Sequence, residues 1–283
     1  MEFNDYINLD KGVIWLLTND TIYFSKDDGA TAEPIKLSTA SSCLKFSKID
    51  KDHILLFCQG LNSQQFISVT ADSERRPIQT NSFLIDPNFT MTNIHSTVYI
   101  QNLLFILDNN NAGTGTGIIR VFGIATNADG SINGTEQKQT LDFSTFSLDK
   151  TSPIQGFDIL PTDSEKTKTI ICTIDEGVGY GNFNLDGDFS IAGSYMNLNT
   201  NSSVSDYTLD GNRFLQIKYL YSNLDNNQHT VLMTITLGAH LQLTFKFDKK
   251  YSIADVIIVN SFNKYGSQRV VNTLWMTKYS ALD

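Results

Sequence analysis

Basic residues are scarce in this chain of 283 residues. Lysine and arginine total 21 against 30 aspartates and glutamates, which gives a formal net charge of −9. Arg75 and Arg76 are the only adjacent arginines. Nucleic-acid backbones and anionic membrane surfaces are bound by clustered cations. We therefore expect neither nucleic acid nor a lipid surface among the partners.

Long apolar stretches are also missing. The longest apolar runs, such as Val13–Leu17 and Leu103–Leu107, have about five residues, whereas a helix that spans a bilayer needs roughly 20. We therefore expect no direct membrane insertion. Residues 1–10 have no basic segment followed by an apolar one, so no signal peptide is expected in this sequence. The compartment stays unknown, and a secreted or lumenal location is favoured if the chain is a mature fragment.

Cysteine is rare, with Cys43, Cys58 and Cys172 making an odd number without the spacing of metal ligands. Each lies in or beside an apolar run, as a small core residue does. We therefore expect buried cysteines rather than a disulfide framework. A single Cys43–Cys58 bridge stays open, because these two residues could lie on neighbouring strands.

Four Asn-x-Ser/Thr sequons are present, at Asn19, Asn88, Asn133 and Asn201. The chain has 25 Asn, 25 Ser and 28 Thr, so composition alone predicts between four and five such sequons. Their number therefore does not indicate a glycoprotein.

What the chain does have is many short apolar runs rich in β-branched and aromatic residues. Turn residues such as Asp28-Gly29, Asp129-Gly130 and Asn133-Gly134 separate them. No window of 12 or more residues shows an uninterrupted helical stripe. The fold class is therefore predicted to be all-β. The main runs are Val13–Leu17, Thr21–Phe24, His53–Phe57, Gln65–Val69, Val98–Ile100, Leu103–Leu107, Ile118–Phe122, Thr169–Ile174, Phe214–Ile217, Thr230–Thr236, Leu241–Phe247, Ala254–Val259 and Val270–Met276.

The spacing of these runs favours a β-propeller of about six four-stranded blades, or part of a larger propeller. Such blades repeat at roughly 40–50 residues, and an all-β chain of this length must also dispose of its sheet edges. We expect one propeller domain over residues 1–283. Its approximate blades are residues 3–40, 44–86, 90–145, 154–199, 204–248 and 253–283.

The segment Ser25-Lys26-Asp27-Asp28-Gly29-Ala30-Thr31 stands between two predicted strands. It resembles the Asp box, S-x-D-x-G-x-T-W, of BNR-repeat propellers of the sialidase and sortilin type, with Ala32 in place of the usual Trp. The resemblance implies a structural hairpin turn built by Ser25, Asp27, Gly29 and Thr31, which speaks to fold and not to activity. An Asp/Gly hairpin also arises without any family relation. Forty-five residues later, Thr70–Glu74 keeps the hydroxyl and the Asp but has Glu where Gly belongs.

Residues 125–136 partly match the calcium loop D-x-[DN]-x-[DN]-G-x-I-x-x-x-E. Asn127, Asp129, Asn133 and Glu136 are weak candidate ligands. The first loop position is Ala125, however, and residues 118–124 form an apparent strand where a calcium loop of this type follows a helix. Two successive turns explain the same residues, so no metal site is assigned.

No set of catalytic residues can be assigned. A sialidase-like hydrolase would need an arginine cluster with an acid/base and a Tyr–Glu pair, and its arginines would come from separate blades. The histidines are scattered without zinc-ligand spacing. We therefore expect no cofactor. The arginines are Arg75, Arg76, Arg120, Arg213 and Arg269, and the histidines are His53, His95, His229 and His240.

The expected function is binding without catalysis, by a propeller that presents loops to a protein partner. One alternative is a glycan-binding, lectin-like propeller with aromatic side chains at blade tips. A second alternative is a sialidase-like glycoside hydrolase with polar groups in the central channel. The aromatic candidates for the first alternative are Trp15, Trp275, Tyr99, Tyr180 and Tyr221.

Overall fold

The computed structural model describes residues 3–10, 12–38, 42–60, 63–87, 91, 94–108, 117–142, 154–185, 192–200, 213–235, 240–248, 253–262 and 268–269. Secondary structure in these ranges is almost entirely β, and their helical structure is short and of the 3₁₀ type, as in η4, Leu224–Asn226. The predicted all-β class is confirmed. None of the helical structure described is long and apolar enough to cross a membrane.

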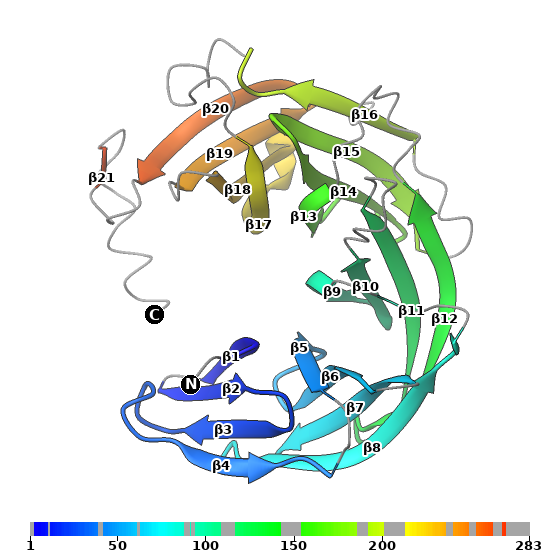
Figure 1. The fold of residues 1–283 in the computed structure, drawn as a ribbon. Coiled ribbons are helices and arrows are strands. Elements are labelled where there is room, and N and C mark those ends of the chain that lie inside the picture. Colours follow the sequence, from blue (N-terminus) through cyan, green and yellow to red (C-terminus); the bar gives the residue numbers. More distant parts are fainter. Residues whose placement is uncertain are drawn as a thin grey trace. The chain divides into compact units, whose positions relative to one another are not determined.

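The chain divides into two compact units, residues 1–106 with 120–139, and residues 107–119 with 140–283. The described strands form five sheets, and in each the strands neighbour one another in chain order (Figure 1). Three sheets lie wholly or mostly in unit 1. The first consists of β1 (Asp5–Asp10), β2 (Val13–Leu17), β3 (Thr21–Ser25) and β4 (Glu33–Lys36), the second of β5 (Ser42–Lys48), β6 (His53–Gln59), β7 (Gln64–Ala71) and β8 (Pro77–Ile85), and the third of β9 (Ile94–Ile100), β10 (Leu103–Asp108), β11 (Ile118–Thr126) and β12 (Ile132–Asp142).

Among the described residues of unit 1, two apolar clusters lie on opposite faces of the second sheet. Successive side chains of a strand point to opposite faces. On β6, Leu56 therefore packs with Trp15 of the first sheet, and Leu55 packs with Leu104 of the third. All six residues of His53–Cys58 are buried. This explains why the run reads as continuously apolar rather than alternating.

Unit 2 contains two further antiparallel sheets that share one apolar cluster. Ile171 and Val178 of the fourth sheet pack with Val231 and Phe245 of the fifth. The fourth sheet consists of β13 (Ile154–Leu160), β14 (Thr167–Ile174), β15 (Gly177–Asn184) and β16 (Ala192–Asn197), and the fifth of β17 (Phe214–Asn223), β18 (Gln228–Ile235), β19 (His240–Phe247), β20 (Ile253–Phe262) and β21 (Gln268–Arg269).

The fifth sheet corrects one predicted boundary. The spacing of apolar runs predicts the start of a new blade at Ile253, but β20 pairs with β19 from His240–Phe262 to Phe247–Ile253. Ile253 therefore begins a fourth strand of an existing sheet. The run Ala254–Val259 is apolar although β20 follows three other strands of its sheet, so the run alone does not tell the first strand of a new sheet from the fourth strand of an existing one.

Cys43 and Cys58 form a disulfide in the core of unit 1. They stand directly opposite each other on β5 and β6, and both are fully buried. The open alternative of a bridge is therefore the one observed, and the expectation of free buried cysteines holds only for Cys172. Burial raises the pKa of the Cys172 thiol, whose Sγ donates to the Gly179 carbonyl at 3.4 Å.

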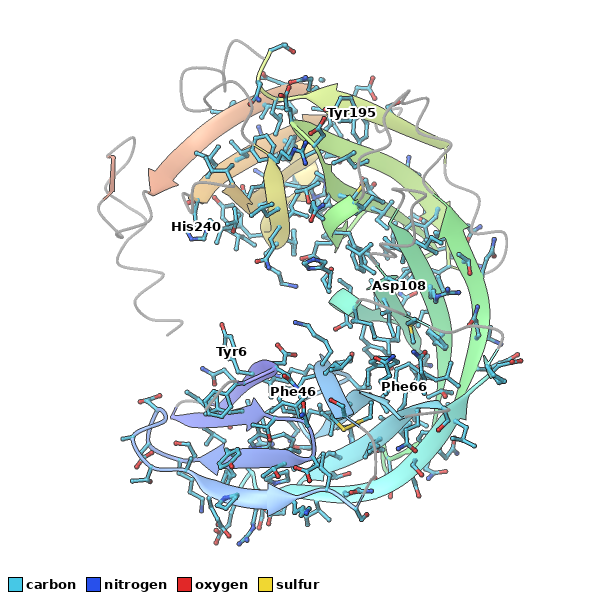
Figure 2. The ribbon with its side chains drawn as sticks, viewed as in Figure 1. Tyr6, Phe46, Phe66, Asp108, Tyr195 and His240 are labelled. Atoms are coloured by element: carbon cyan, nitrogen blue, oxygen red, sulfur yellow. A yellow bond between two sulfur atoms is a disulfide. The ribbon has the colours of Figure 1, made fainter. Side chains whose placement is uncertain are left out.

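The core of unit 1 makes a direct prediction for Phe66 of β7, which is fully buried and meets Phe122 edge to face at 5.1 Å (labelled in Figure 2). We expect Phe66→Ala to lower the free energy of unfolding by about 3–5 kcal/mol, because it removes the ring and leaves a cavity. Leu84→Ala, on the neighbouring strand but 75% exposed, should stay within about 0.5 kcal/mol of the parent. Urea unfolding followed by fluorescence measures both, and equal losses would contradict the two-cluster core.

Candidate functional site

One face of the first sheet carries a row of apolar side chains that crosses all four strands. Tyr6 of β1 pairs with Leu16 of β2, Leu16 with Tyr23 of β3, and Tyr23 with Pro34 of β4. Residues paired across strands share a face, so these four side chains form one row. We call this the open face and include Phe3, whose ring meets that of Tyr23 at 5.9 Å, and Ile14, on the same side of β2 as Leu16.

The open face is exposed in the described part of the chain. Tyr6 is 69% exposed and Phe3 41%, and Figure 2 shows the Tyr6 side chain extending beyond the β1 ribbon. Leu16 and Tyr23 are partly buried. The opposite face of the same sheet, with Trp15 among its residues, is buried in the cluster shared with the second sheet. The first sheet thus has one apolar face covered within unit 1 and a second that belongs to neither of that unit's clusters.

The predicted Asp turn lies between β3 and β4, at one end of this sheet. Its Asp27 carboxylate accepts hydrogen bonds from the Thr31 backbone N–H at 2.8 Å, the Thr31 hydroxyl at 2.6 Å and the Ser25 hydroxyl at 2.8 Å. The Gly29 N–H donates to the Ser25 hydroxyl at 2.9 Å, and Gly29 has φ +88°. These bonds favour the ionised carboxylate. The hydrogen bonds from Thr31, then that from Ser25, lower the pKa of Asp27 to about 2.

The turns between the third and fourth strands of the second and third sheets share a geometry that differs from that of the Asp27 turn. Arg75 N–H donates to the Asp72 carbonyl and Asp72 N–H to the Arg76 carbonyl. Gly130 N–H donates to the Asn127 carbonyl, and Asn127 N–H to the carbonyl of residue 131, in the same pattern. The fourth residue has a left-handed backbone in both turns, with φ +65° at Arg75 and +84° at Gly130. Arg75 thus adopts a conformation that favours glycine.

Ion pairs surround Arg75 in this conformation. Its guanidinium contacts the carboxylates of Asp52 and, at 3.3 Å, Asp10 of the first sheet. The Arg75 carbonyl accepts the indole N–H of Trp15 at 2.8 Å. The turn therefore joins the first and second sheets at one end of unit 1, where Arg76 also pairs with Glu33.

Two aspartates on the first strand of a sheet contact the first strand of the next sheet. They are Asp5 on β1, which contacts β5, and Asp158 on β13, which contacts β17. Asp5 accepts the Phe46 backbone N–H at 2.8 Å and pairs with Lys45 at 3.1 Å. In unit 2, Asp158 accepts the Tyr219 N–H at 2.8 Å and pairs with Lys218 at 3.1 Å. β5 and β17 are edge strands. These carboxylates therefore satisfy backbone donors that have no partner in their own sheet.

The weak calcium candidates lie at the β11–β12 hairpin. Asp129 accepts the Ser131 N–H at 2.9 Å, and the Asn133 side chain donates to that of Asn127 at 2.6 Å. Glu136 contacts Lys138. Within the ranges described above, no group of three His, Cys, Asp or Glu side chains is placed to hold a metal ion.

The aromatic candidates for sugar stacking are mostly unavailable. Trp15 and Tyr180 are buried, and Tyr99 is partly buried, with its hydroxyl donating to Asn102 at 2.9 Å. Tyr221 is 39% exposed. Trp275 lies outside the described residues.

One serine–histidine contact was not anticipated. The Ser222 hydroxyl lies 2.6 Å from Nδ1 of His229, and Nε2 of that ring lies 3.3 Å from the Asn227 carboxamide oxygen. Burial lowers the pKa of His229 to about 4, and Asp163 offsets this only in part. A histidine with so low a pKa is a poor general base toward the Ser222 hydroxyl at neutral pH. Nothing in the sequence marked this pair, because it arises from cross-strand register.

The Asp27 turn predicts a specific titration. In Thr31→Val, which loses the side-chain donor, the pKa of Asp27 should rise from about 2 toward its ordinary value of 3.8. A carboxyl group whose pKa is lowered by folding stabilises the fold above its unfolded pKa, and that contribution is lost as pH falls from about 4 to about 2. Carbon-detected NMR of the carboxyl group measures the shift. An unchanged pKa in the variant would show that Thr31 does not hold this turn.

Two glycines predict different costs for the same substitution. Both need a left-handed backbone, so alanine costs about 1 kcal/mol at either one. A Cβ at Gly29 meets no atom within 4 Å, whereas one at Gly130 lies 3.0 Å from Cε1 of His53. We therefore expect Gly130→Ala to destabilise more than Gly29→Ala in thermal unfolding. When His53→Ala is also present, the difference in destabilisation between Gly130→Ala and Gly29→Ala should be smaller. Equal destabilisation by the two glycine substitutions in the presence of His53 would contradict the contact.

Comparison with known proteins identifies the fold. No family model matches the sequence, and no curated protein matches it. Among solved structures, the β-propeller domain of Nup133 from Vanderwaltozyma polyspora is 17% identical over 94% of this chain and 69% of that one, with a TM-score of 0.50. A periplasmic gluconolactonase from Pseudomonas aeruginosa is 11% identical over 86% and 78%, and Drosophila Plexin A, in complex with Semaphorin 1b, is 7% identical over 93% and 81%, each with a TM-score of 0.41. The likeness to the first structure, together with the five sheets, shows a β-propeller fold.

Proposed function

We propose that this chain is a non-catalytic β-propeller that binds a protein partner through the open face of its first sheet. The observation that carries the proposal is the apolar row of Tyr6, Leu16, Tyr23 and Pro34, which crosses four strands and leaves Tyr6 69% exposed. Exposed contiguous apolar surface marks interaction sites, and tyrosine is enriched in interface cores.

The fifth sheet supplies a contrast. One of its faces packs on the fourth sheet, and its other face mixes polar side chains with the apolar Leu232, Tyr221 and Ile257. Thr230 and Thr244 pair across strands there with their hydroxyls 2.8 Å apart, and Thr234 lies 3.0 Å from Nδ1 of His240. The two middle strands of this sheet thus carry threonines in the row that runs from Tyr221 to Ile257. The open face also carries polar side chains, Asn8, Thr21, Ser25 and Lys36, but its central row is apolar on all four strands, which supports its assignment to a partner.

The row favours a partner that presents an apolar β-sheet face. Sheets pack face to face in unit 1, with aliphatic and aromatic side chains interdigitating. A row that crosses four paired strands suits a sheet better than a single helix, which requires a groove between elements.

Size argues against a second copy of this chain as the occupant. With strands about 4.8 Å apart and a rise of about 3.3 Å per residue, a four-stranded face of this length covers roughly 300–400 Å². A two-fold dimer over it would bury well under the roughly 1,200 Å² of a stable interface. The proposed partner is therefore a different protein, with an interface that extends beyond the open face.

We also propose that the scaffold is a propeller of the Asp-box type. The hydrogen bonds of Ser25, Asp27, Gly29 and Thr31 support it. A turn of this kind supports the fold and takes no part in binding, so the scaffold and the binding face are separate parts of the proposal.

A photo-crosslinker in place of Tyr6, in the cells that produce the protein, tests the binding face. We expect crosslinks to one other protein, at a peptide of one of its β-strands. With that partner purified, Tyr6→Asp should weaken the measured affinity at least tenfold, because a charge would be buried against apolar side chains. Leu84→Asp, equally exposed but on the second sheet, is the matched control and should bind as the parent does.

Three outcomes would overturn the proposal. Crosslinks from position 6 to other residues of the same chain would show that the face is covered within the molecule. Crosslinks to a second copy would make it a self-association surface. An equal loss of affinity in both aspartate variants would show that binding does not depend on the open face.

A further inference from the structure

Asn19 is the exposed first residue of a sequon in the turn between β2 and β3. Its side-chain oxygen accepts hydrogen bonds from the Asn4 carboxamide at 3.0 Å and from the Ser42 hydroxyl at 3.0 Å. In the described part of the chain, Nδ2 of Asn19 makes no hydrogen bond. The side chain is therefore held through its oxygen, while its nitrogen is left for another bond.

The disulfide supplies an independent observation. Cys43 and Cys58 are bonded in the core, and Cys43 N–H donates to the Asn19 carbonyl at 2.6 Å. Structural disulfides persist in oxidising compartments and are rare in the cytosol. A chain that matures with this bond passes through the environment in which Asn-x-Ser/Thr sequons are modified in secreted proteins.

The structure separates Asn19 from the other described sequon. Asn133 uses its side-chain nitrogen to donate to Asn127 at 2.6 Å, within the β11–β12 hairpin. A sugar on that nitrogen would crowd the hairpin and disturb the bond. A sugar on Nδ2 of Asn19 replaces one hydrogen and leaves both bonds to its oxygen in place. Asn88 and Asn201 lie outside the described residues.

We propose that Asn19 carries an N-linked glycan. The linkage is an N-glycosidic bond between Nδ2 and the anomeric carbon of the first sugar; it forms as the bond from that carbon to a lipid-linked diphosphate breaks, the lipid diphosphate leaves, and the nitrogen loses one proton. The inference does not depend on the partner-binding proposal, because it rests on the turn, the sequon and the disulfide.

The test uses tagged full-length chain from the cells that naturally produce it. Enzymatic removal of N-glycans in H₂¹⁸O converts an occupied Asn19 to ¹⁸O-labelled Asp, which peptide mass spectrometry detects. Thr21→Val removes the sequon without altering Asn19 and should abolish the label. Thr21→Ser preserves the sequon and should keep it. We expect label at Asn19 in the parent and in Thr21→Ser.

An unlabelled Asn19 in the parent would overturn the proposal, as would label at Asn133 in its place. Alkylation of the same sample before reduction provides a second readout. We expect Cys43 and Cys58 to be protected from the reagent. If both react as free thiols, the oxidising environment is absent and the proposal fails on that ground.

Discussion

Each sheet of this chain must have its apolar faces covered by something other than itself. On β6, neighbouring residues Leu55 and Leu56 pack into different clusters, because the strand is apolar on both sides. A single four-stranded sheet with such faces is not stable in water, so the sheets must stack. Stacking accounts for the near-continuous apolar run of the middle strand.

Sheets that stack face to face do not pair through their backbones, so each sheet has edge strands. In this chain, side chains accept hydrogen bonds from backbone N–H groups of those edge strands. Asp5 and Asp158 each accept a backbone N–H from the first strand of the following sheet and pair with the lysine just before it. Asp158 is only 3% exposed, so the charge depends on these donors. The same arrangement occurs separately in both units. Within each unit, the contact between these neighbouring sheets is thus polar at the first strand and apolar in the middle.

The sequence predicts the middle strands well and the outer strands poorly. Val13–Leu17 and His53–Phe57 are buried and apolar, and both runs fall on strands. β8 and β12 were not anticipated as apolar runs, because outer strands such as Pro77–Ile85 are largely exposed and carry polar residues. The Asp27 turn was visible from its Asp and Gly. The open face was not, because period-two alternation does not say which of two apolar faces is covered, and the Cys43–Cys58 bond depends on register.

The repeat in this chain is one of backbone geometry rather than of sequence. The turns at Asp72 and Asn127 share their hydrogen bonds and a left-handed fourth residue, yet that residue is Arg75 in one and Gly130 in the other. Glycine meets the conformational requirement without help. Arginine meets it with ion pairs to Asp52 and Asp10, so the strained residue also ties two sheets together. Because different side chains serve one geometry, sheets of this kind can stack regularly while their sequences keep little in common.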